Sequence, residues 1–231
     1  MPPFPPLLAA TFVSRPNRYL IVAEHDGRQI EAACRDPGRL GWLLHPGVAL
    51  RLRSASGPHR RTAFDVVLAR RGASWVSLLP TLANQLFEEA VASGGAPGLR
   101  GARVLRREIG HGESRFDFLL SHRGRRVLAE VKSVGLVEGG RALFPDAPTA
   151  RGVRHLRELT AHARSGGAAL LAFVVQGSGA RAVAPHADLD PEFAAALTEA
   201  HRAKVRVLGF SCQVNEQGVR IRGSLPVLIP R

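Results

Sequence analysis

Two short stretches, Arg115-Phe-Asp-Phe-Leu-Leu120 and Val127-Leu-Ala-Glu-Val-Lys132, decide the fold of this 231-residue chain. Each mixes aromatic or aliphatic residues with polar ones over a few positions, as is typical of half-buried strands. The segment between them has Arg123-Gly124 at its centre, which suits a tight turn. The sequence therefore predicts an antiparallel hairpin whose register is set by this turn.

This register gives the hairpin one apolar and one charged face. The facing apolar pairs are Phe116 with Val131, Phe118 with Ala129, and Leu120 with Val127. On the charged face Asp117 lies opposite Glu130, and Lys132 follows two positions later. Directly opposed β-carbons are about 4.5–5.5 Å apart, so the two carboxylates can share one divalent cation. The alternative is a charged strand face that is merely solvated.

Lysine is rare in this chain. Lys132 and Lys204 are its two lysines, and 30 arginines supply the remaining positive charge. Lysine is a compact charge with a tunable pKa, whereas arginine is a planar fork that keeps its proton. Lysine at position 132 therefore indicates a task that arginine performs poorly. Two carboxylates and a lysine on adjacent strands are what metal-dependent phosphodiester cleavage requires.

The overall charge points to a polyanionic partner. The net charge is +13 and the pI is about 11.5, which favours nucleic acid first and anionic membrane second. The sequence has no basic amphipathic helix, and its longest apolar run, Ala168–Val175, is too short to span a bilayer. We therefore expect DNA as the partner, with RNA also considered, and no membrane.

The cysteines and the start of the chain bear on location. Cys34 and Cys212 are far apart and have neither metal-binding nor disulfide spacing, which suits a reducing compartment. The first residues lack the basic start and the long apolar stretch of a signal peptide. The sequence predicts a cytoplasmic protein and leaves its oligomeric state open, a homodimer included.

The chain divides into two predicted domains. Residues 1–80 alternate short strand patterns with turn signals, which fits a small β-barrel of the OB-fold type that would bind nucleic acid. Residues 81–231 are predicted to form an α/β domain in the order αβββαβ, with an extension. The predicted elements of that order are a helix at 81–92, strands at 104–109, 115–120 and 127–134, a helix at 149–165 and a buried strand at 168–175.

Both helices carry polar residues near their buried faces. Glu89 lies close to the apolar stripe of the first helix, where it suits either a salt-bridge partner or a wall of the active pocket. A polar stripe runs along the second helix, and a solvated face is its plain interpretation. The stripe consists of Arg151, His155, Glu158 and His162.

Several motifs together resemble one known family. They are Ser114-Arg-Phe-Asp-Phe-Leu-Leu120, Glu130-Val-Lys-Ser-Val134, Leu143-Phe-Pro-Asp-Ala-Pro-Thr149, and Asn84-Gln-Leu with Glu89-Ala90. Over nearly its whole length the chain is similar to the sugar fermentation stimulation protein A family. One departure is Asp36-Pro37, which stands where the family usually has Asn-Thr.

The resemblance implies an OB-fold joined to a restriction-endonuclease-like PD-(D/E)xK domain with DNA binding and metal-dependent nuclease activity. Carried over, Asp117 and Glu130 are the metal ligands, Lys132 is the catalytic lysine and Glu89 is a further member. Pro145-Asp146 follows the Glu-x-Lys triplet, so the metal aspartate is Asp117 and Pro145-Asp146 is predicted to form a turn at the mouth of the site.

From these observations we expect a nuclease that uses Mg²⁺ or Mn²⁺ to hydrolyse phosphodiester bonds in DNA. RNA is a further candidate substrate. The alternative is a DNA-binding regulator of sugar metabolism genes whose metal site is vestigial. Candidate phosphate contacts beside the site are Arg115, Arg151 and His155, and those on the barrel are Arg51, Arg53, Arg60 and Arg61.

Overall fold

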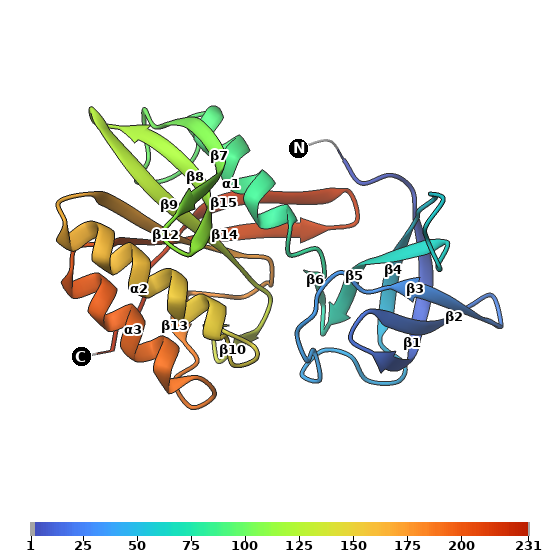
Figure 1. Ribbon diagram of the computed structural model, residues 1–231. Coiled ribbons are helices and arrows are strands. Elements are labelled where there is room, and N and C mark those ends of the chain that lie inside the picture. Colours follow the sequence, from blue (N-terminus) through green and yellow to red (C-terminus); the bar gives the residue numbers. More distant parts are fainter. Residues whose placement is uncertain (1–2, 231) are drawn as a thin grey trace.

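The computed structural model describes residues 3–230 and consists of a small β-barrel followed by an α/β domain (Figure 1). The predicted fold class is confirmed by this arrangement. Among the described residues, no helix is long and apolar enough to cross a membrane.

The barrel is built from antiparallel strand pairs and closed by one parallel pairing. Its strands are β1 (Leu7–Asn17), β2 (Leu20–His25), β3 (Arg28–Ala33), β4 (Ala49–Ser54), β5 (Phe64–Arg71) and β6 (Ser74–Ser77). They are ordered β3-β2-β1-β4-β5-β6, and β3 also pairs with β5, which closes the sheet on itself. Inward residues of β1, β2 and β4 alternate with outward ones and contribute to the apolar core of the barrel, whereas β5 is buried over a continuous run.

A buried carboxylate ties the barrel together where it closes. Asp65 on β5 is 2% exposed and forms ion pairs with Arg35, Arg53 and Arg60 at 2.7–3.1 Å. Burial alone would raise the pKa of Asp65, but hydrogen bonds from Arg60 and Arg53 and the charge of Arg35 outweigh it and lower the pKa. Three positive charges therefore depend on one carboxylate.

Replacing Asp65 with alanine should destabilise the protein by about 3 kcal/mol at pH 7, since it leaves three arginines crowded without a partner. Because the folded-state pKa lies below the unfolded value, the stabilisation exists above about pH 4 and is lost as the pH falls through the folded-state pKa. Urea unfolding at pH 7 and pH 3 measures both effects. Arg61→Ala, a change at an exposed neighbour, should cost little. An Asp65→Ala protein as stable as the wild type at pH 7 would contradict this account.

The second domain has a mixed six-stranded sheet between helices. Its elements are α1 (Leu82–Ala92), β7 (Arg103–His111), β8 (Ser114–His122), β9 (Arg125–Val134), β10 (Val137–Glu138), β11 (Arg141–Phe144), α2 (Ala150–Arg164), β12 (Ala168–Val175), β13 (Ala182–Pro185), α3 (Pro191–Arg202), β14 (Arg206–Asn215) and β15 (Gly218–Leu225). The sheet order is β15-β14-β12-β9-β8-β7, and β9, β12 and β14 run parallel to one another.

The helices cover opposite faces of this sheet (Figure 1). One apolar cluster packs α1 against one face, and another packs α2 and α3 against the other. Asp190 fixes the start of both covering helices, because its carboxylate accepts the Phe193 N–H of α3 at 2.9 Å and the Thr149 N–H before α2 at 2.8 Å. A small sheet, β10-β11-β13, was not predicted; β10 and β11 lie just before Pro145, and β13 follows β12.

The predicted hairpin register is correct from Phe118 to His122, where Phe118 pairs with Ala129 and Leu120 with Val127. The ladder between β8 and β9 ends there, so Phe116 and Val131 do not share one apolar layer. Phe116 instead lies in the cluster under α2, with its ring 5.3 Å from that of His155. The reason is local: the Asp117 carboxylate, not a backbone carbonyl of β8, accepts the Val131 N–H.

Candidate metal centre

Glu130 is the buried centre of the site. It lies on the parallel strand β9 and is 4% exposed. Its Oε1 atom interacts with Lys132 Nζ at 2.6 Å and with His155 Nδ1 at 2.5 Å. Burial alone would raise the pKa of Glu130, but the His155 hydrogen bond and the Lys132 charge outweigh it and lower the pKa. Glu130 is therefore held as a carboxylate in a buried position.

Asp117 occupies the point where β8 separates from β9. Its Oδ1 accepts a hydrogen bond from Asn84 Nδ2 at 2.6 Å, and its Oδ2 accepts the Val131 N–H at 2.8 Å. Burial, with the charge of nearby Glu130 next in size, raises the pKa of Asp117 to about 6. Two carboxylates thus lie close enough to repel each other, and both are fixed in orientation.

The predicted trio is brought together. Lys132 is 13% exposed, with its amine on Glu130 and its charge acting on Asp117. Two of the other predicted residues lie at the edge of this group. Arg115 is exposed and pairs with Glu108 at 3.5 Å, and Arg151 donates from Nε to His155 Nε2 at 3.3 Å.

Two predicted roles differ from what the structure shows. His155 is 1% exposed and binds Glu130, so it is a carboxylate partner and not a surface contact for phosphate. The polar stripe of α2 is consequently not a solvated face, since Glu158 also turns inward to accept the Ser114 hydroxyl hydrogen bond at 2.8 Å. Helical periodicity located the stripe correctly, but strand β8 covers it.

Glu89 lies beside β15, and its predicted place in the site stays a prediction. It accepts a hydrogen bond from Gln85 and lines a shallow hollow with Arg220 and Ile221 of β15. The side chain of α1 that reaches the site is Asn84, more than one turn earlier. Sequence reasoning missed Asn84 as a site residue, because the rotation of α1 against the sheet is set by packing.

Three of the four barrel arginines are engaged within the protein. Arg53 and Arg60 bind Asp65, as described above. Arg51 binds Glu216, in the β14–β15 turn of the second domain, at 2.8 and 3.0 Å, and stacks over Trp75 at 4.8 Å. These contacts tie the two domains together and stabilise the barrel. Arg61 is exposed, and its contact with nucleic acid stays a prediction.

Comparison with known proteins decides the family. Residues 81–218 match the family model described as the sugar fermentation stimulation protein RE domain, and residues 13–78 match the SfsA N-terminal OB domain. The chain belongs to the sugar fermentation stimulation protein (SfsA) family. The resemblance seen in its motifs is thereby confirmed.

Similar SfsA proteins match along almost their whole lengths. A sugar fermentation stimulation protein homolog of Moorella thermoacetica is 44% identical over 90% of this chain and 91% of its own. A homolog of Methanothermobacter thermautotrophicus is 41% identical over 91% of this chain and 88% of its own. The solved structure of Pyrococcus furiosus SfsA in complex with Ca²⁺ is 29% identical, has a TM-score of 0.91 and covers 98% of both chains.

The residues of this SfsA protein fit a hard divalent cation. Glu130 Oε2 is buried without a hydrogen-bond partner, and a buried carboxylate oxygen without a partner requires an explanation. Among residues 3–230, no group of three or more acidic, histidine or cysteine side chains is placed to hold a metal. A cation would therefore be held by Asp117 and Glu130, with water molecules as its remaining ligands, which is the coordination that Mg²⁺ prefers.

Adding Mn²⁺ should raise the melting temperature, and the rise should fade as the pH drops below about 6. Asp117 must lose its proton to bind a cation, so metal affinity should fall by about tenfold per pH unit below the pKa of this carboxyl. Thermal unfolding with and without Mn²⁺ at pH 8 and pH 5 measures the effect. Glu130→Gln should abolish the rise at both pH values, and Asp188→Asn, at an exposed carboxylate, should keep it. An equal rise at both pH values would argue against this site.

Proposed function

We propose that this SfsA protein is a divalent-metal-dependent nuclease that hydrolyses phosphodiester bonds in DNA, with RNA as a further candidate substrate. The proposal rests mainly on one observation. The buried Glu130 and the half-buried Asp117 converge with one of two lysines, and one oxygen of Glu130 is buried without a partner. Such a group suits phosphoryl chemistry at neutral pH.

Asp117 and Glu130 would hold Mg²⁺ or Mn²⁺, which when bound supplies an activated water and neutralises phosphate charge. Lys132 would hold the attacking water or stabilise the charge that develops on the phosphoryl oxygens. Its amine suits this role because Glu130 fixes it while 13% of the side chain stays exposed.

Neighbouring residues position this group. His155 holds Glu130 from behind, and Arg151 donates to the other nitrogen of the same ring. Asn84 and the Val131 N–H fix both oxygens of Asp117. Carboxylates oriented in this way need little reorganisation when a cation and a phosphate bind.

Two further facts support the proposal. The Pyrococcus furiosus relative was solved in complex with Ca²⁺, a hard divalent cation that carboxylates bind. The net charge of +13 suits a polyanionic substrate. The proposal places the protein in the cytoplasm, where its two free cysteines, both buried, would remain reduced.

Incubation with labelled single- and double-stranded DNA and RNA tests the proposal directly. We expect cleavage of DNA with Mg²⁺ or Mn²⁺ and none with EDTA. The relatives are named for stimulating sugar fermentation, which favours a DNA-binding regulator as the second candidate. Metal-independent DNA binding without cleavage of any of the four substrates would support that regulator and reject the nuclease.

A further inference from the structure

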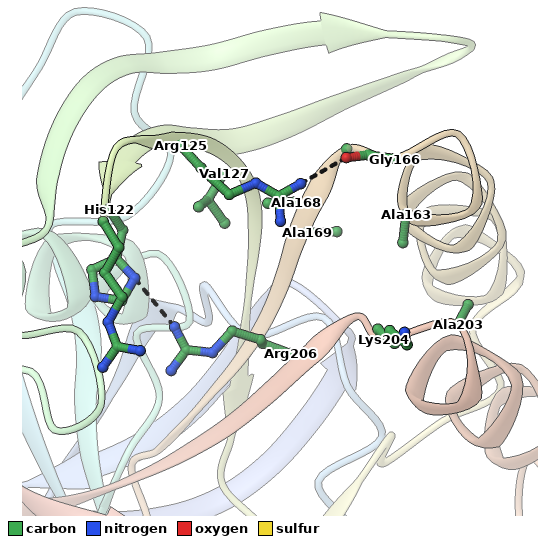
Figure 2. Close-up of a pocket in the computed structure, with 12 residues that line it drawn as sticks. His122, Arg125, Val127, Ala163, Gly166, Ala168, Ala169, Ala203, Lys204 and Arg206 are labelled. Atoms are coloured by element: carbon green, nitrogen blue, oxygen red, sulfur yellow. Dashed lines mark hydrogen bonds between the residues drawn. The ribbon is translucent and has the colours of Figure 1, made fainter.

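A basic pocket lies at the edge of the sheet where the parallel strands β9, β12 and β14 begin (Figure 2). Its volume is about 590 Å³. The candidate metal centre lies further along β9, and the eight residues from Arg125 to Lys132 span roughly 23 Å of strand. The pocket is therefore distinct from the site described above.

The polar lining of this pocket is positively charged. It contains Arg123, Arg125, Lys204 and Arg206, together with His122, and no carboxylate lines it among the described residues. Arg125 and Arg206 are anchored on the backbone carbonyls of Gly166 and Gly98 at 2.7 and 2.8 Å. Each guanidinium has five N–H donors, so these bonds leave donors for a ligand.

The cations of the pocket are close enough to disfavour one another. His122 is buried, and its Nδ1 accepts a hydrogen bond from Arg206 Nη1 at 3.3 Å. Burial, followed by the charges of Arg206 and Arg123, lowers the pKa of His122. Burial and the charge of Arg123 also lower the pKa of Arg206. A bound anion would relieve this repulsion.

Two of the cationic residues have a left-handed backbone conformation, which is unfavourable for lysine and arginine. Lys204 has φ +68° just after α3, and Arg123 has φ +51° in the β8–β9 turn. Glycine or asparagine adopts this conformation at lower cost at a helix C-terminus and in a two-residue hairpin turn. Lys204 is also one of the two lysines in an arginine-rich chain. Neither charge is explained by local conformational preference.

The floor of the pocket is made of small residues. Gly166, Ala168 and Ala203 line it at the ends of α2 and α3 (Figure 2). A basic rim around a small apolar floor matches the chemistry of a phosphate joined to a sugar or base. We propose that this pocket binds the phosphate of a nucleotide-sized ligand. The phosphate could belong to a free nucleotide or to a strand end.

A structural explanation competes with this proposal. The C-terminal ends of α2 and α3 carry partial negative charge, and cations next to them stabilise helices. If Lys204 serves that purpose, its removal should lower the melting temperature and leave ligand binding unchanged. If it serves a ligand, Lys204→Gly should relieve backbone strain and weaken binding.

The experiment follows the His122 imidazole resonance by NMR during titration with inorganic phosphate, adenosine monophosphate or a 5′-phosphorylated oligothymidine. We expect adenosine monophosphate to raise the pKa of His122, because a nearby anion favours the imidazolium. Lys204→Gly and Arg123→Asn should each weaken binding by about tenfold without lowering the melting temperature. Arg28→Asn makes the same charge change on the barrel and should alter neither the binding affinity nor the melting temperature.

The outcomes separate the sources and the explanations. A response to the oligonucleotide but not to adenosine monophosphate assigns the phosphate to a strand end, and a response to adenosine monophosphate but not to the oligonucleotide assigns it to a free nucleotide. A response to both supports a site for the phosphate that the two share. No response of His122 to any of the three probes overturns the proposal, as does a Lys204→Gly protein that melts earlier and binds normally. Glu130→Gln should leave the response intact, so failure of the proposed nuclease function would not affect this result.

Discussion

Replacing Lys132 with alanine should lower the rate of metal-dependent DNA cleavage by about 10²–10³-fold, because it removes a cation positioned for the developing phosphoryl charge. The Lys132 amine lies 2.6 Å from Glu130, beside the carboxylate oxygen that has no partner. Single-turnover cleavage of a labelled oligonucleotide in Mn²⁺ measures the loss. The rise in melting temperature on Mn²⁺ addition should persist, since Asp117 and Glu130 remain.

Lys132→Arg is the sharper variant. It keeps the charge but places a planar fork where a compact amine is held in a nearly buried position, so activity should stay about 10²-fold low. Arg126→Ala removes an exposed cation from the same strand and should keep full activity. Full cleavage by Lys132→Arg would show that any positive charge suffices and would remove the main argument for a catalytic lysine.

Nucleic-acid affinity should fall by about 10³-fold between 50 and 200 mM salt if six phosphates are neutralised. The charge of +13 motivates this expectation, but the structure restricts which arginines can contribute. Arg115 and Arg151 are exposed beside the carboxylates, whereas Arg51 is held by Glu216. Fluorescence anisotropy of a labelled duplex in EDTA, measured over a salt series, gives the slope.

Arg151→Gln and Arg115→Gln should each weaken binding and reduce the slope of log affinity against log salt by about 0.9, the value for one lost phosphate contact. Arg157→Gln is the matched control, since it lies on the same helix as Arg151, is exposed and pairs with Glu192. Affinity that does not change with salt would rule out phosphate-dominated binding. If Arg157→Gln reduces the slope of log affinity against log salt by the same amount, the effect is one of overall charge, and nucleic acid does not bind at a defined surface beside the site.

Much of the metal centre could be predicted because its main parts are close together in the sequence. Asp117, Glu130 and Lys132 lie on one hairpin, and the Arg123-Gly124 turn fixes how its strands pair. Local turn chemistry and apolar alternation are short-range properties, so they can be read without knowing the rest of the chain. The same holds for the strand-rich first domain.

The partners of these residues could not be predicted in this way. Asn84 reaches Asp117 from 33 positions away, and His155 reaches Glu130 from 25 positions away. Arg51 forms its ion pair with Glu216, which is 165 positions away, and this pair decides whether Arg51 is available to a ligand.

The sequence alone therefore predicted the pairing next to the hairpin turn, the charged trio and the excess of positive charge. The tertiary structure was needed to show which charged side chains form ion pairs within the protein and which remain available to a ligand. The physical reason is that an ion pair or a buried hydrogen bond depends on the rotation and packing of whole elements. Those are set by the apolar clusters on the two faces of the sheet and not by the neighbours of any one charged residue.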